Sequence, residues 1–151
     1  MNKKKSIGDN KRILLDTSFL LPILGFETSE RIMKAFYKLG SYQLYYNEIS
    51  ILEALWKIVK VIRGEEEEVL RIRQGIRSIF ETINHASIDD NAINNAVYMY
   101  RLGHRDMIDN LLYSIALSRK LLLLTVDEKL IDFIEKHNLP RNNIIAPEQL
   151  D

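Results

Sequence analysis

The sequence predicts an α/β domain in which a parallel sheet is covered by helices on both faces. Short apolar runs alternate with longer segments of helical period along most of the chain, as in a parallel sheet with helical crossovers. Two of these runs, 13–15 and 121–124, lack the polar alternation of a half-exposed strand, which indicates strands buried on both faces. The length of 151 residues suits one domain with its own core.

About five strands are expected in this sheet. The third is weak and the fifth is short, and right-handed crossovers leave few ways of ordering them. The expected ranges are 11–15, 42–46, 83–88, 121–125 and 143–146. Residues 11–151 are therefore expected to form a single domain, preceded by a disordered basic tail at residues 1–10 that contains Lys3, Lys4 and Lys5.

Helices are expected in the connections between these strands. Pro22 stops the first one early, Gly40 is placed to cap the end of the second, and Asn47 to cap the start of the third. The expected ranges are 17–24, 28–39, 47–62, 65–80, 87 or 89 to 103, 105–118 and 127–137. In the third helix the apolar positions predict a buried stripe of Leu52, Leu55, Trp56, Val59 and Ile62.

Composition excludes several classes of function. The chain has no cysteine, which rules out a thiolate zinc site, a catalytic thiol and a disulfide framework. Its 21 basic and 21 acidic residues cancel, so the net charge gives no indication of nucleic-acid binding. No signal peptide and no membrane-spanning stretch is recognisable, so we expect a cytoplasmic protein that does not bind membranes.

Four acidic residues stand where a parallel sheet places its functional site. Asp16 directly follows the first strand, and Asp127 comes shortly after the fourth. Glu53 falls in the second turn of the helix after the second strand, and Asp109 is early in its own helix. Because sites in such folds lie beyond the carboxyl ends of the strands, where strand order reverses, these side chains are expected to converge.

Converging carboxylates repel one another, and no basic residue recurs at these strand ends to pair with them. A divalent cation resolves the repulsion, and hard oxygen ligands suit Mg²⁺ or Mn²⁺, which can activate water for attack on a phosphodiester. Each acid also has an ordinary structural interpretation as a helix cap or as half of an ion pair: Asp16 and Asp127 as caps, Glu53 paired with Lys57, and Asp109 paired with Arg105.

The segments that carry these four acids resemble the motifs of the PIN-domain family. They read ILLDTSFLL at 13–21, ISILEAL at 49–55, DNLLYSIAL at 109–117 and LLLTVD at 122–127. Any one of them is a weak match, whereas four in the family's order, spread from Lys11 to about Ile145, are fairly specific.

The resemblance implies a three-layer α/β/α fold, ribonuclease activity that depends on Mg²⁺ or Mn²⁺, and a homodimer. At this length the chain is most similar to the VapC toxins of toxin–antitoxin pairs, which a small antitoxin holds inactive. The resemblance makes Asp16, Glu53, Asp109 and Asp127 the metal ligands and catalytic residues that act on RNA. It also makes the hydroxyls of Thr125 and Ser18 supports for these acids.

Asp106 lies three residues before Asp109, on the same helix face. We expect it to be the N-cap of that helix, and a role as a fifth site acid is the alternative. Other side chains have structural interpretations. The histidines are not expected to bind metal: His85, His104 and His137. The arginines of the fourth helix are expected in solvent: Arg71, Arg73 and Arg77. Three aromatic residues are expected in the core: Tyr45, Tyr46 and Trp56.

Two other functions remain open on the same scaffold. One is a nuclease of ribosomal-RNA maturation or a DNA-directed nuclease, and the other is a non-catalytic PIN-like binding protein. Dinucleotide-binding and P-loop sites are excluded because their glycine motifs are absent. The sequence after the first strand, Asp16-Thr17-Ser18, lacks the second aspartate of haloacid-dehalogenase phosphatases, and the paired acids of receiver domains are also absent.

Overall fold

The computed structural model describes residues 11–151 and has the predicted α/β architecture, so the expected tail at residues 1–10 lies outside the described residues. Five parallel strands form one sheet in the order β3-β2-β1-β4-β5. Strand order therefore reverses between β1 and β4. The strands are β1 (Arg12–Leu15), β2 (Gln43–Tyr46), β3 (Asn84–His85), β4 (Leu122–Leu124) and β5 (Ile144–Ile145).

Helices connect the strands close to the predicted positions. They are α1 (Thr17–Leu20), α2 (Glu30–Phe36), α3 (Glu48–Ile58), α4 (Glu66–Thr82), α5 (Asp90–Leu102), α6 (Met107–Arg119) and α7 (Glu128–Lys136). Asn47 caps α3 as expected, because its side chain accepts a hydrogen bond from the Ile49 N–H. Gly40 is not the expected helix cap, since α2 ends at Phe36 and Gly40 lies within a short 3₁₀ turn, Leu39–Ser41.

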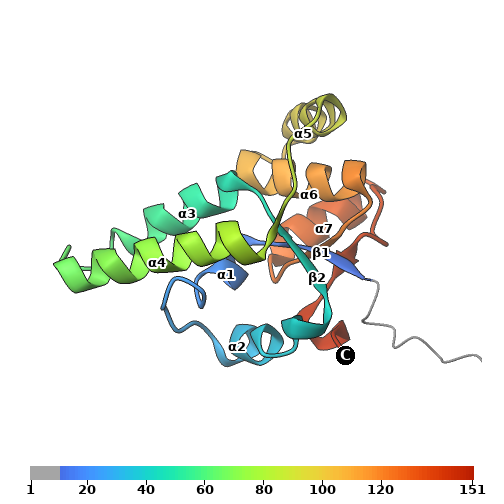
Figure 1. The fold of residues 1–151 in the computed structure, drawn as a ribbon. Coiled ribbons are helices and arrows are strands. Elements are labelled where there is room, and N and C mark those ends of the chain that lie inside the picture. Colours follow the sequence, from blue (N-terminus) through green and yellow to red (C-terminus); the bar gives the residue numbers. More distant parts are fainter. Residues whose placement is uncertain (1–10) are drawn as a thin grey trace, which may run out of the picture.

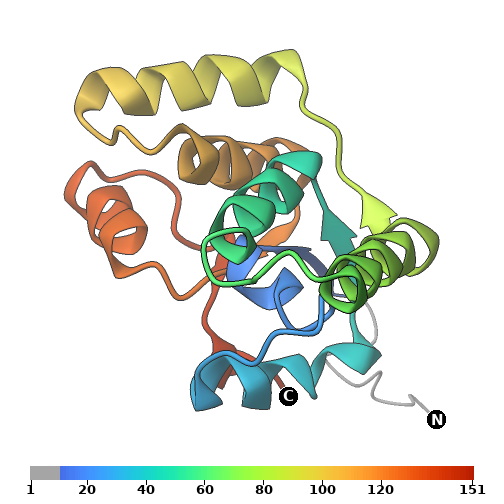
Figure 2. The same ribbon diagram turned by 90° about the vertical axis from the view of Figure 1, so that its left-hand side faces the viewer.

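The two faces of the sheet carry separate apolar cores, which gives three layers (Figures 1 and 2). Along β1, Ile13 and Leu15 point to the core that α1 to α4 complete, whereas Leu14 points to the core that α5 to α7 complete. This alternation is what a strand buried on both faces requires. None of the helices within residues 11–151 is both long enough and apolar enough to cross a membrane.

The buried face of α3 differs from the predicted one. The helix buries Ile51, Ala54 and Ile58, and two members of the predicted stripe, Leu55 and Ile62, are partly buried against the same core. The other members, Leu52, Trp56 and Val59, are exposed, so the prediction was wrong for these three. Because α3 is apolar on more than one face, periodicity alone does not select the packed one. The expectation for the aromatics is therefore correct for the buried Tyr46, met in part by the half-buried Tyr45, and wrong for Trp56.

α4 lies very close to the chain segment that follows α1. A Cβ atom on Gly75 would lie 2.6 Å from the Ile23 carbonyl oxygen and 2.8 Å from the Leu24 Cα. Glycine at this position therefore sets how closely α4 approaches the rest of the domain. Figure 1 shows that α3 and α4 extend together beyond the sheet.

Candidate metal centre

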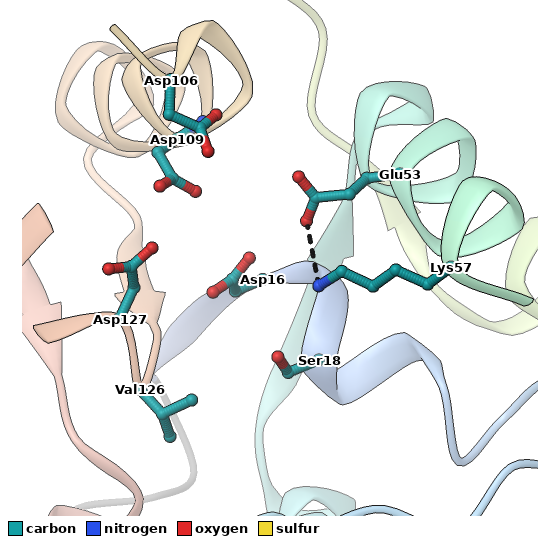
Figure 3. Close-up of a pocket in the computed structure, with 8 residues that line it drawn as sticks. All are labelled: Asp16, Ser18, Glu53, Lys57, Asp106, Asp109, Val126 and Asp127. Atoms are coloured by element: carbon teal, nitrogen blue, oxygen red, sulfur yellow. Dashed lines mark hydrogen bonds and ion pairs between the residues drawn. The ribbon is translucent and has the colours of Figure 1, made fainter. Parts of the chain in front are cut away.

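A cavity of about 320 Å³ opens at the carboxyl edge of the sheet, beside the strand reversal between β1 and β4. α6 leads into β4 and contacts it, so the start of α6 lies at this same edge. Figure 3 shows side chains from these separate elements pointing into one space. The lining residues are Asp16, Ser18, Glu53, Lys57, Asp106, Asp109, Val126 and Asp127. The structure thus brings together the four acids that the sequence singled out.

Asp16 ends β1 and is held by two hydrogen bonds. Its Oδ1 accepts from the Thr17 N–H at 2.6 Å, and its Oδ2 accepts from the Thr125 hydroxyl at 2.8 Å. Burial raises the pKa of Asp16 to about 6, helped by repulsion from Glu53 and Asp127, and the two hydrogen bonds limit the rise. The side chain is therefore fixed in orientation and is destabilised when charged, which a bound cation would offset.

Thr125 connects two of the site acids. Its side chain is buried, and its oxygen accepts a hydrogen bond from the Asp127 N–H at 3.1 Å while its hydroxyl donates to Asp16. One hydroxyl thereby couples the end of β1 to the loop after β4. Ser18, the other hydroxyl that the resemblance suggested, lines the cavity.

Asp109 and Asp127 form a coupled pair. Asp127 also caps α7, because its Oδ1 accepts from the Leu130 N–H at 3.1 Å. Burial raises the pKa of Asp109, and its hydrogen bond with Asp127 raises it further. Burial acts in the same direction on Asp127, but the hydrogen bond from Asp109 and those from backbone N–H groups lower its pKa overall. Asp109 is therefore the more readily protonated acid of this pair.

Glu53 has the ion-pair partner that its structural interpretation requires. Its Oε1 lies 3.6 Å from the Lys57 Nζ, one helical turn further along α3. Asp109 lacks the pairing considered for it, because Arg105 instead donates to the Tyr100 hydroxyl at 3.1 Å. Among the described residues that line the cavity, Lys57 is the only base.

Asp106 combines the two roles that the sequence left open. Its Oδ1 accepts from the Asp109 N–H at 3.1 Å, which makes it the N-cap of α6, and its side chain also lines the cavity. The residue that sequence reasoning did not place in the site is Lys57. The available signal was its position one turn after Glu53, on the same face of α3.

The lining fits a hard divalent cation by its chemistry. Carboxylate oxygens dominate it, and the one ammonium group leaves most of their charge unbalanced. Within residues 11–151, no three Asp, Glu, His or Cys side chains are close enough to hold an ion as they stand. Mg²⁺ keeps several waters and often contacts only one or two carboxylates directly, so an ion with part of its water shell fits this donor set.

Residues 13–136 match the sequence profile of the PIN domain. The chain belongs to the PIN-domain family. The match spans the strand and helix segments that contribute all four predicted acids. Among curated proteins, none matches this PIN domain.

Solved structures share the PIN fold across nearly their whole length. A chain of a toxin–antitoxin complex from Klebsiella pneumoniae is 17% identical, with a TM-score of 0.61 over 89% of this chain and 97% of that one. FitAcB from Neisseria gonorrhoeae is 18% identical, with a TM-score of 0.64 over 91% and 99%. DNA-bound VapBC from Salmonella typhimurium is 15% identical, with a TM-score of 0.60 over 91% and 98%.

Proposed function

We propose that this PIN-domain protein is an endoribonuclease that hydrolyses RNA phosphodiester bonds with Mg²⁺ or Mn²⁺. The observation that carries the proposal is the convergence of Asp16, Glu53, Asp109 and Asp127 on one open cavity at the strand reversal. Two of these acids have raised pKa values, and such values are common at catalytic sites.

The four acids would hold the cation, each in a manner set by its element. When bound, a divalent cation supplies an activated water and positive charge for the scissile phosphate. Asp16 presents its carboxylate in the orientation that Thr17 and Thr125 fix. Asp109 has to release the proton that it shares with Asp127, so binding of the cation is coupled to proton release.

We further propose that the protein is the toxin of a VapBC-type pair, partnered by a small antitoxin and by a second copy of itself. The compared chain from Klebsiella pneumoniae belongs to a toxin–antitoxin complex, and this chain covers 97% of it. α5 leaves apolar Ile93, Val97 and Tyr100 exposed on one face, where a second copy can pack. We place the protein in the cytoplasm, where its RNA substrate is.

The experiment is cleavage of a mixed pool of RNA and single-stranded DNA by pure protein with Mn²⁺ or with EDTA. We expect cleavage of RNA with Mn²⁺ only, and its loss in Asp16→Asn. Asp132→Asn is the matched control, because this exposed acid on α7 lies outside the cavity and its change should leave the rate unaltered. Equal cleavage by Asp16→Asn would reject the assigned site, and cleavage of DNA alone would favour the DNA-directed nuclease.

A further inference from the structure

Lys57 is the single cationic side chain in the described lining of the cavity. It reaches the cavity from α3, and its Nζ lies 3.6 Å from the Glu53 Oε1. Figure 3 shows the amine pointing into the space that the carboxylates of Glu53 and Asp16 face. The rest of this lining supplies five carboxylates, one hydroxyl and one apolar side chain. Lys57 is therefore the one group of the described lining that opposes the repulsion among these acids.

The pair of Glu53 and Lys57 is not an ordinary ion pair on a helix surface. The Glu53 side chain is only 17% exposed, whereas the Lys57 side chain is 54% exposed. The carboxylate is thus largely enclosed by the cavity, and the ammonium enters from the solvent side. Lys34 and Glu30 form the same i, i+4 pair on α2, but there both side chains are well exposed. Screening by water makes such a surface pair weak, whereas the enclosed carboxylate of Glu53 depends more strongly on its partner.

Lys57 can leave Glu53 without any movement of α3. The helix is anchored by Ala54 and Ile58, which are buried in the core. A lysine ammonium is a point charge on a flexible four-carbon chain, so rotation of the side chain alone carries it away from a carboxylate. The exposure of the Lys57 side chain leaves room for this rotation.

Two positive charges compete for the same carboxylate when the acids hold a divalent cation. The ammonium and the cation repel each other, so Lys57 lowers the affinity of the site for the cation. Once turned away from Glu53, the ammonium remains at the mouth of the cavity. A phosphodiester that enters is negatively charged, and lysines commonly stabilise the charge that develops on a reacting phosphate.

We propose that Lys57 acts first as a resident counter-ion and then as a catalytic residue. In the metal-free protein its ammonium partly neutralises Glu53 and limits the repulsion within the cavity. Once the acids hold a cation, the ammonium turns from Glu53 to a non-bridging oxygen of the scissile phosphate. There it stabilises the negative charge that develops as the phosphorus gains a bond to the oxygen of water and loses its bond to the ester oxygen.

Lys57 acts by its charge alone in this scheme. The water supplies the proton that the leaving oxygen takes up, and the ammonium keeps its own protons throughout. The inference rests on the proposed nuclease function and adds a residue to the same site.

The first test is calorimetric titration of the metal-free protein with Mn²⁺, which does not depend on cleavage. Lys57→Gln removes the charge and keeps much of the side chain, so we expect it to bind Mn²⁺ about 3- to 10-fold more tightly than wild type. Lys34→Gln is the matched control, because it breaks the corresponding pair outside the cavity, and its affinity should equal that of wild type. Equal or weaker binding by Lys57→Gln overturns the competition at Glu53.

The second test is single-turnover cleavage of RNA at saturating Mn²⁺, where a change in affinity for the cation has no effect on the rate. Lys57→Gln should cleave about 10- to 100-fold more slowly than wild type, because the phosphate loses its ammonium contact. Lys57→Arg should retain most of the rate, since a guanidinium also binds phosphate. An unchanged rate in Lys57→Gln overturns the catalytic role.

The directions of these changes separate the inference from a loss of structure and from the proposed function. Loss of structure weakens binding and slows cleavage together, whereas Lys57→Gln is expected to bind Mn²⁺ more tightly and to cleave more slowly. Wild-type protein that binds Mn²⁺ but does not cleave RNA rejects the nuclease and with it the catalytic role, while tighter binding by Lys57→Gln still supports the resident counter-ion. Failure of wild type and of Lys57→Gln to bind Mn²⁺ overturns both proposals.

Discussion

The hydroxyl of Thr125 is the smallest group on which the geometry of the cavity depends. It bonds to the Asp16 carboxylate and to the Asp127 N–H, so the two acids that follow neighbouring strands share one support. Groups that orient metal ligands in this way commonly contribute 10- to 100-fold to metal affinity or activity, which is about 1.4 to 2.7 kcal/mol.

Thr125→Val keeps the volume of the side chain and removes only the hydroxyl. We expect it to lower RNA cleavage about 10- to 100-fold and the free energy of unfolding by about 1 kcal/mol. The reason is that the hydrogen bonds of this buried hydroxyl with the Asp16 carboxylate and with the Asp127 N–H are both lost. Thr125→Ser should restore most of the rate. If Thr125→Val cleaves at the wild-type rate with Mn²⁺, Thr125 does not position the acids.

Asp16 gives the metal-free protein a defined dependence on pH. Its pKa is raised from 3.8 to about 6, so between these values the folded state holds a proton that the unfolded state has released. Stability in EDTA is therefore expected to fall as the pH rises through this window, by up to about 3 kcal/mol, and the raised pKa of Asp109 extends the fall upward.

Asp16→Asn removes this contribution, so its stability relative to wild type should increase from pH 4 to pH 7. The measurement is urea unfolding of both proteins in EDTA at several pH values, with Asp132→Asn as the control for a general change of charge. A constant difference between Asp16→Asn and wild type across the window would show that Asp16 is not destabilised by burial.

Helix boundaries were largely predictable from the sequence, whereas helix faces were less so. Asn47 was predicted as a cap, and a cap was the structural alternative considered for Asp127; both do cap their helices. Cap side chains bond to their own helix, so they depend on local sequence. The packed face of α3 depends on what approaches it in the fold, and that information is not local. Trp56 was therefore predicted to lie in the core because of its residue type, but it is exposed because no other element within residues 11–151 packs over its face of α3.

Replacing Gly75 by alanine tests how closely α4 packs against the segment that follows α1. In an exposed helix, replacing glycine by alanine stabilises by about 1 kcal/mol. Here the added methyl would meet the Ile23 carbonyl at 2.6 Å, so we expect Gly75→Ala to destabilise by about 1 to 3 kcal/mol, measured by urea unfolding. A gain in stability would mean that α4 does not approach this segment so closely.

At the scale of the whole molecule, the strand order determines the site. The order β3-β2-β1-β4-β5 places the ends of β1 and β4 next to each other, and with them Asp16 and Asp127. Alternating apolar and helical segments predicted a parallel sheet, and the general rule for such sheets predicted where the acids would meet. The pairing of Lys57 with Glu53 inside the cavity was not assigned to the site, because an ion pair on one helix is common on any surface.

The most direct test of the proposed metal centre is calorimetric titration of the metal-free protein with Mn²⁺ in two buffers of different ionisation enthalpy. We expect binding that releases protons, because Asp109 gives up the proton that it shares with Asp127, and loss of binding in Asp16→Asn. Absence of Mn²⁺ binding, or equal binding by Asp16→Asn, would contradict the claim that these acids form a metal centre.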